Sequence, residues 1–190
     1  MIEQRTGILT IEEFISLYDE EGPFEIIDGE RITLSPPKAG HVSITKRILF
    51  AVERFAIEHD LGEAFSEGPF VETDGPTWVT GSRVPDVMYY TKERLTLYKA
   101  EVPDWQDKPF MIVPDLVVEV ISSNDKYTEV AAKVDKYLED GVLTVWIVDQ
   151  KRHTITVRTP IDYVTLHMNE VLVGGNVLPG FSVKVAEIFR

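Results

Sequence analysis

No cysteine occurs among the 190 residues, so disulfide bonds and cysteine-ligated zinc or iron–sulfur sites are excluded. The chain also lacks any apolar run that approaches the ~20 residues of a membrane-spanning helix. Its first ten residues, MIEQRTGILT, have neither the basic segment nor the apolar core of a signal peptide. These absences predict a soluble protein of a reducing compartment, and we expect it to be cytoplasmic with no membrane partner.

Positive charge is scarce, because 19 Lys and Arg residues face 32 Asp and Glu residues and the formal net charge is −13. Proteins that bind nucleic acid neutralise its phosphates with basic side chains, so this composition argues against binding by charge alone. Most of the acids are expected on a solvated surface. The hydrophobic fraction of 44% is ordinary for a globular protein, and the length fits one domain that spans residues 1–190.

Three segments have the apolar spacing of amphipathic helices. They are residues 10–20, 41–60 and 123–140. The first begins with a capping-box pattern from Thr10 to Glu13. In the last, Ser123 or Asn124 is the expected N-cap, and Gly141 is the expected stop. The expected inner face of this last helix consists of Tyr127, Val130, Ala131, Val134, Tyr137 and Leu138.

Other segments have the composition and alternation of β-strands. They are residues 24–28, 31–35, 63–73, 84–91, 116–121, 143–148, 153–158 and 163–168. The first two flank an Asp28-Gly29 turn and form an expected hairpin, and a further hairpin is expected near the C-terminus. The segment 116–121 is apolar almost throughout, which indicates burial on both faces in the centre of a helix-covered sheet. The pattern as a whole predicts an α/β protein.

Three acids lie within or at the start of apolar strands, where an unpaired charge is costly. Glu119 is in the middle of Val117–Ile121, Asp86 follows Pro85 at the start of another strand, and Glu25 lies in a third. Each alone has a structural interpretation, as a hydrogen-bonded core Glu or a strand-start Asp. Together, three acids from three strands can converge on one divalent cation, and their hard oxygen ligands suit Mg²⁺ or Mn²⁺.

Asp115 also precedes Glu119, but spacing separates the two carboxylates. They are four positions apart on one strand, which places them roughly 13 Å apart. That distance is too long for a shared ion, so Asp115 is interpreted as a strand-start residue. Asp86, on a neighbouring strand, can instead lie across from Glu119.

Several fragments of the chain follow one another in an order that resembles one protein family. They are Phe24–Glu30, Ser35-Pro36 with the following His41, Pro85-Asp86, Pro114–Ser122, Lys133–Val142, Trp146–Asp149 and Val177–Phe181. The resemblance is to the Uma-type restriction endonuclease family, a branch of the PD-(D/E)XK nuclease superfamily, and it covers nearly the whole chain. It implies a restriction-endonuclease-like mixed β-sheet flanked by helices, with an N-terminal helix and β-hairpin, and metal-dependent hydrolysis of phosphodiester bonds in DNA.

The resemblance also implies roles for individual residues. Asp86 and Glu119 match the motif acids that would bind Mg²⁺ or Mn²⁺, and Glu25 matches an acid of the first strand. The superfamily motif has a lysine two residues after the second acid, where this chain has Ile121. Members of the family take the lysine from the next helix, and Lys133 occupies the matching position. Asp86, Glu119, Lys133 and Glu25 are therefore the candidate catalytic residues.

In the implied mechanism, the cation polarises a phosphoryl oxygen and lowers the pKa of a bound water. Lys133 would orient that water or stabilise charge in the transition state. It borders the buried stripe of its helix, three residues after Val130 and four before Tyr137, although a solvent-facing lysine is the structural alternative. His41 and Gln150 are weaker candidates for polar partners near the site.

Two other functions remain open at this point. The displaced lysine and the negative charge favour a nuclease-fold protein that has lost catalysis and serves as a binding or regulatory partner. A hydrolase of smaller phosphate esters or nucleotides would also tolerate the charge. For a nuclease, a local basic edge for DNA would come from Lys38, Lys46, Arg47, Arg54, Lys151, Arg152 and Arg158. We expect a homodimer that pairs through the apolar segments 171–173 and 181–185.

Overall fold

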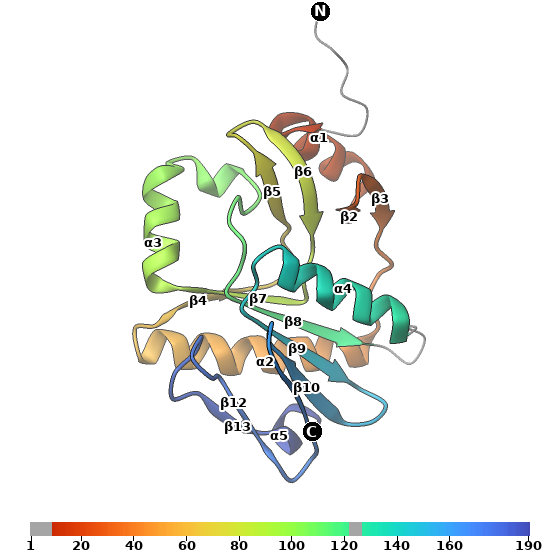
Figure 1. Cartoon of the computed structure of the whole chain (residues 1–190), viewed down its shortest axis with the longest axis vertical. Helices are drawn as coiled ribbons and strands as arrows, with labels where there is room; N and C mark the ends of the chain where they lie inside the picture. The colour runs from red at the N-terminus through yellow and green to blue at the C-terminus, as the bar shows by residue number, and fades with distance from the viewer. Residues whose placement is uncertain (1–8, 122–126) are drawn as a thin grey trace, which may run out of the picture.

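The computed structural model describes residues 9–121 and 127–190, which form helices packed on β-sheets (Figure 1). The helices are α1 (Ile11–Glu21), α2 (Ala39–Glu58), α3 (Lys92–Glu101), α4 (Tyr127–Glu139) and α5 (Val185–Ile188), with a short 3-10 helix at Trp105–Asp107. Thr10 caps α1 through the predicted capping box with Glu13. The predicted N-cap of α4, Ser123 or Asn124, lies outside the described residues. In the described ranges, no helix has the length and apolar character needed to cross a membrane.

A six-stranded sheet forms the centre of the fold, in the order β11-β10-β9-β8-β7-β4. Its strands are β4 (Gly62–Phe65), β7 (Val87–Thr91), β8 (Leu116–Ile121), β9 (Thr144–Asp149), β10 (Thr154–Arg158) and β11 (Tyr163–Leu166). The β8–β9 pair is parallel and the other pairs are antiparallel, so the sheet is mixed, as predicted. The apolar strand β8 lies inside this sheet, which confirms the burial that its composition indicates.

A second sheet has the order β1-β6-β2-β3, with β5 also paired to β6. Its strands are β1 (Leu9–Thr10), β2 (Phe24–Ile27), β3 (Glu30–Thr33), β5 (Phe70–Asp74) and β6 (Trp78–Arg83). The β2–β3 pair is the predicted N-terminal hairpin. The predicted C-terminal hairpin is also present, as β12 (Val171–Val173) and β13 (Ser182–Lys184).

The two faces of β8 contact different helices, and this alternation orients the functional side chains. Val118 and Val120 belong to a buried cluster with residues of α2, whereas Val117 packs in a cluster with Val134 and Tyr137 of α4. Figure 1 shows α2 and α4 on opposite sides of the central sheet. Because side chains alternate along a strand, Glu119 lies on the same side as Val117 and faces α4.

Three sequence-based expectations are wrong in detail. The predicted strand 63–73 is two strands in different sheets, β4 and β5, and the segment 78–83 is an additional strand. The helix α3 is a further element without a sequence prediction, because it buries only Leu95 and Tyr98 and therefore has little amphipathic signal. Tyr127, predicted on the inner face of α4, has 81% of its surface exposed. Phe181 and Val185, predicted to pair with a second copy, are buried in the core of this chain.

Candidate active site

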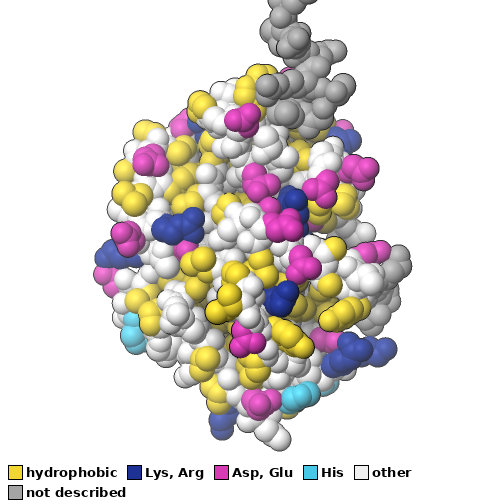
Figure 2. Space-filling model, in the orientation of Figure 1, with side chains coloured by type: hydrophobic (Ala, Val, Ile, Leu, Met, Phe, Trp, Pro, Cys, Tyr) yellow, Lys and Arg dark blue, Asp and Glu magenta, His cyan; other side chains and the backbone are white. Residues whose placement is uncertain are grey.

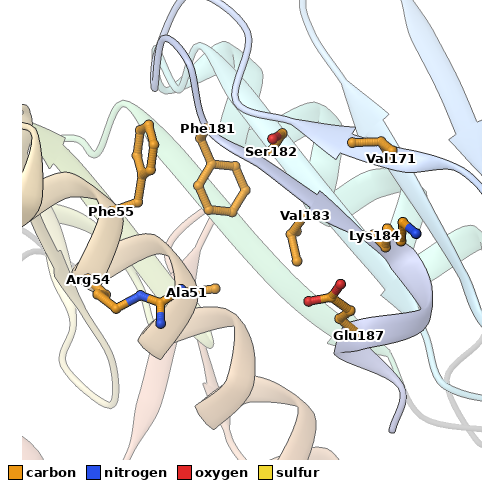
Figure 3. Close-up of a pocket in the computed structure, with 9 residues that line it drawn as sticks. All are labelled: Ala51, Arg54, Phe55, Val171, Phe181, Ser182, Val183, Lys184 and Glu187. Carbon is orange, nitrogen blue, oxygen red and sulfur yellow. The ribbon is translucent and has the colours of Figure 1, made fainter.

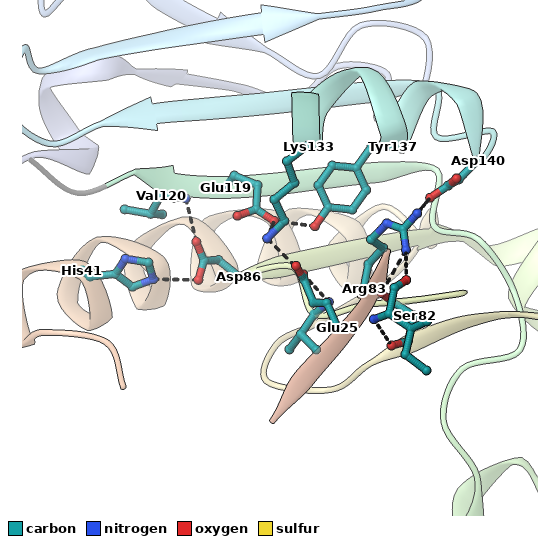
Figure 4. Close-up of polar contacts among 12 residues, drawn as sticks. Glu25, His41, Ser82, Arg83, Asp86, Glu119, Val120, Lys133, Tyr137 and Asp140 are labelled. Carbon is teal, nitrogen blue, oxygen red and sulfur yellow. Dashed lines mark hydrogen bonds and ion pairs between the residues drawn. The ribbon is translucent and has the colours of Figure 1, made fainter. Parts of the chain in front are cut away.

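Side chains from β2, β8, α4 and the loop before β7 meet where α4 covers β8 (Figure 4). Glu25 comes from β2, Asp86 directly precedes β7, Glu119 is in β8 and Lys133 is in α4. The Lys133 ammonium lies 3.0 Å from Oε1 of Glu25 and 3.0 Å from Oε1 of Glu119. The structure thus brings together the four residues that the sequence singles out, although they are spread over more than a hundred positions.

Glu119 receives two contacts from successive turns of α4. Lys133 and Tyr137 are four residues apart, so both side chains lie on the face of α4 that covers β8. The Tyr137 hydroxyl donates a hydrogen bond to Oε1 of Glu119 over 2.5 Å, and the Lys133 ammonium contacts the same oxygen. Two donors thus stabilise the charged form of a carboxylate that burial in an apolar strand disfavours.

Asp86 is held next to Glu119 by the strand register. The antiparallel pair β7–β8 aligns Val87 with Val118, which places Asp86 opposite the residue that follows Val118. Oδ2 of Asp86 accepts a hydrogen bond from the backbone N–H of Val120 at 2.6 Å. Its other oxygen, Oδ1, lies 2.6 Å from Nε2 of His41 at the start of α2. His41, a weaker candidate from sequence, is thus a direct partner of a motif acid.

Glu25 is almost completely buried, with 2% of its surface exposed. Its Oε1 accepts a hydrogen bond from the backbone N–H of Val84 at 2.9 Å and contacts the Lys133 ammonium. These two donors fix the carboxylate between the loop that leads to Asp86 and the helix α4. Glu25 therefore holds the Lys133 ammonium in position.

Burial and the clustered charges shift the titration of this group of side chains. Burial raises the pKa of Glu119 to about 7, an effect that the Lys133 charge opposes and that the charges of Asp86 and Glu25 increase. The pKa of Lys133 is raised, because attraction to Glu119 and Glu25 outweighs the desolvation that alone would lower it. Burial, with the Glu119 charge, raises the pKa of Tyr137 well above 10. Lys133 is therefore cationic and Tyr137 a neutral donor at physiological pH.

The remaining sequence candidates lie outside this cluster. Ile121 is partly buried at the end of β8, and its position is aligned with Asp149 of β9. Asp115 accepts hydrogen bonds from the N–H and hydroxyl of Thr91 and pairs with Arg94 at 2.6 Å, as expected for a strand-start residue. The Gln150 side chain lies beside Gly40 near the start of α2.

The carboxylates of the cluster suit a divalent cation only as a partial ligand set. Within residues 9–121 and 127–190, no group of three or more His, Cys, Asp or Glu side chains is arranged to hold a metal ion. Mg²⁺, however, usually takes only one or two protein carboxylates and completes its shell with waters and substrate phosphates. Asp86 and Glu119 on adjacent strands supply such a pair. The three acids together also exceed the single positive charge of Lys133, so a divalent cation would balance the cluster.

Two participants were not identified as such from the sequence. Tyr137 was expected only as part of the apolar inner face of α4, yet its hydroxyl is bonded to Glu119; its spacing of four from Lys133 is the signal that was available. Arg83 is 1% exposed and donates to the carbonyl oxygen of Ile26, the residue after Glu25; its place three residues before Asp86 was the only sequence signal available.

A surface groove of about 340 Å³ lies elsewhere, between α2 and the C-terminal hairpin (Figure 3). It is lined by Ala51, Arg54, Phe55, Val171, Phe181, Ser182, Val183, Lys184 and Glu187. None of these is a candidate catalytic residue, so the groove and the acidic cluster are separate features.

Comparison with known proteins identifies the fold and the family of this chain. One solved structure, described as "a putative nuclease belonging to DUF820" from Anabaena variabilis ATCC 29413, is similar with a TM-score of 0.75. The alignment covers 95% of this chain and 97% of that one, at 20% sequence identity, so it shows a shared fold. The chain matches no curated protein. The family described as "Uma2: Putative restriction endonuclease" matches residues 11–186, and the chain therefore belongs to the Uma2 family.

Proposed function

We propose that this protein is a metal-dependent endonuclease that hydrolyses phosphodiester bonds in DNA, with Mg²⁺ or Mn²⁺ as its cofactor. The observation that carries the proposal is the convergence of Asp86 and Glu119 with a partly buried, charged lysine. This combination supplies two hard ligands and one cationic group, which suit metal-assisted hydrolysis of a phosphodiester. Membership of the Uma2 family and the nuclease-like fold support the same activity.

Each residue has a distinct part in this proposal. Asp86 and Glu119 would bind the cation, which when bound polarises the phosphodiester and lowers the pKa of a water ligand. Lys133, held by Glu25 and Glu119, would donate to the attacking water or to a non-bridging phosphate oxygen as negative charge develops there. Tyr137 holds the Glu119 carboxylate in one orientation through its hydroxyl. Lys133 thus replaces the motif lysine that is absent at Ile121.

The charge distribution bears on how DNA would bind. Figure 2 shows the face of the molecule that is in view in Figure 1. Its Lys and Arg side chains form separate groups with Asp and Glu between them. Several of the candidate basic residues also have partners within the chain, such as Arg152 with Asp149 and Arg158 with Asp135. With a net charge of −13, the protein should bind DNA weakly without a divalent cation. We therefore expect bound metal to contribute to substrate affinity as well as to catalysis.

The decisive experiment is cleavage of plasmid, single-stranded and branched DNA by the purified protein. We expect cleavage with Mg²⁺ or Mn²⁺ and none after removal of the metal with EDTA, because both ligands would then face the phosphate without a cation between them. The Glu119→Ala variant serves as the inactive control. If no DNA is cleaved with either metal, a catalytically degenerate binding or regulatory protein becomes the better interpretation. Cleavage of small phosphate esters alone would instead favour a hydrolase of small phosphate esters or nucleotides.

We also propose that the protein is a homodimer, since cutting both strands of a duplex is commonly achieved with two sites. Val171 and Val173 of β12, and Tyr163 and Val164 of the edge strand β11, are exposed apolar residues that a second copy would cover. Light scattering should give twice the chain mass of 21.6 kDa. A mass near that of one chain at all concentrations would contradict the proposal, and Val173→Lys should shift a dimer toward the monomer.

A further inference from the structure

The strand that carries Glu25 is joined to its neighbour β6 by an unusually short ladder. Only one residue pair, Ile26 with Ser82, is aligned between β2 and β6. Side chains supply further bonds at this junction, because the Ile26 N–H donates to Oγ of Ser82 at 2.9 Å. The position of Glu25 relative to the rest of the site therefore depends on side chains of β6.

Arg83 makes the largest set of these contacts. It is 1% exposed, and its Nη1 donates to the carbonyl oxygen of Ile26 at 2.6 Å and to that of Ser82 at 3.0 Å. The next residue, Val84, donates its N–H to Glu25. The bonds to the backbone of Ile26 and to the carboxylate of Glu25 thus come from three successive residues, Ser82, Arg83 and Val84.

The other arm of the same guanidinium reaches α4. Nη2 of Arg83 lies 3.0 Å from Oδ2 of Asp140, whose side chain is 4% exposed, and 3.9 Å from Oε2 of Glu72 on β5. The Asp140 N–H bonds the carbonyl of Lys136, so this residue continues the helical hydrogen bonding of α4. Asp140 is two helical turns beyond Lys133, on the same rigid element. Figure 4 shows the Arg83 side chain between β2 and the C-terminal end of α4.

We propose that Arg83 is a positioning residue of the active site: its two arms hold β2 and α4 at a fixed separation and so place Glu25 against Lys133. A planar guanidinium suits this task, because its several N–H groups point in fixed directions and can bind two elements at once. The ammonium of a lysine is a single point charge and cannot make the same set of bonds. The catalytic consequence of this inference rests on the proposed function, whereas the geometry it describes does not.

The test uses Arg83→Lys and Asp140→Asn, each of which removes one part of the connection, and Arg94→Met as a matched control. Arg94 pairs with the buried Asp115 at 2.6 Å, away from the cluster, so its loss also leaves a buried carboxylate without its ionic partner. Measurements are made above pH 8, because burial, with the charge of Glu72, raises the pKa of Asp140 to about 7 against the opposing charge of Arg83. The parent then carries the charge that the Asn variant lacks.

In single-turnover cleavage, we expect Arg83→Lys to lower the maximal rate by about 10²-fold and Asp140→Asn by about tenfold, with the half-saturating DNA concentration unchanged. Arg94→Met should lower the melting temperature to a similar extent but leave the rate unchanged. A residue with only a structural role would give the Arg83 and Asp140 variants the same profile as Arg94→Met, and that result would overturn the proposal.

A second readout does not depend on activity. Amide hydrogen exchange of Val84, whose N–H bonds Glu25, should be at least about tenfold faster in Asp140→Asn than in the parent, while Val118 in β8 exchanges at the parental rate. Unchanged exchange at Val84 in Asp140→Asn refutes the positioning role. If the parent protein cleaves no DNA, the proposed function fails, and exchange at Val84 still decides the inference.

Discussion

Glu119→Gln is expected to lower Mn²⁺ affinity by about 10²-fold or more and DNA cleavage by about 10³-fold. The substitution keeps the size of the side chain and an oxygen that can accept the Tyr137 hydrogen bond, but it removes the negative charge that would bind the cation. Asp86→Asn should have a similar effect, since Asp86 supplies the second carboxylate from the neighbouring strand. Calorimetric titration with Mn²⁺ and single-turnover cleavage measure the two effects.

Asp115→Asn is the matched control for these variants. Asp115 is a buried acid on the approach to the same strand, and it is bonded to Thr91 and Arg94 rather than to the cluster. We expect it to lose about 1–3 kcal/mol of stability, as a charged hydrogen-bond partner does, with unchanged Mn²⁺ affinity. Equal Mn²⁺ affinity in the parent, Glu119→Gln and Asp86→Asn would show that these acids are structural and that any metal binds elsewhere.

The central elements of the fold could be predicted because their signals are local. The apolar run of β8 specifies an interior strand, and the apolar stripe of α4 specifies a helix that covers it. The turn at Asp28-Gly29 was equally clear, since both residues have positive φ in the structure, a conformation that Asp tolerates and Gly favours.

The division of the strands between two sheets could not be predicted, because pairing is a property of distant segments. Gly68-Pro69 marks a break within residues 63–73, but it does not indicate that Phe65 ends a strand of one sheet and Phe70 begins a strand of the other. The exposure of Tyr127 has a similar origin. It lies in the first turn of α4, and a helical spacing pattern does not indicate where the covering sheet ends.

The acids of the candidate site could be predicted from the sequence, but most of their partners could not. A carboxylate in an apolar strand is visible from sequence because its burial needs compensation, and this signal led to Glu25 and Glu119. Arg83 gave no such signal, since its partners belong to β2 and α4, two elements that lie more than forty residues before and after it in the chain. The role of Tyr137 could not be predicted, because helical spacing indicates that its side chain is buried but not that its hydroxyl donates a hydrogen bond.

Lys133→Met is expected to reduce cleavage by about 10²–10³-fold while Mn²⁺ affinity stays the same or rises. Met preserves much of the length and the apolar stem of the side chain but removes the cation that lies 3.0 Å from both Glu25 and Glu119. The acids then repel one another with no positive charge between them, so a divalent cation gains attraction. The stability of the metal-free variant should fall by about 3 kcal/mol, because buried carboxylates have lost their partner.

Added Mn²⁺ should restore part of that stability, because a ligand that binds only the folded state shifts the equilibrium toward it.

Lys136→Met is the matched control: Lys136 is one turn away on α4 and pairs with the exposed Asp28 and Glu139. We expect this variant to cleave DNA nearly as fast as the parent, because surface pairs of this kind contribute little and do not reach Glu119. If Lys133→Met cleaves DNA at the parental rate, the lysine of α4 does not replace the one missing at Ile121, and a catalytic role for Lys133 is wrong. If Lys133→Met loses both cleavage and Mn²⁺ binding, its charge is needed to hold Glu119 in place and its role is structural.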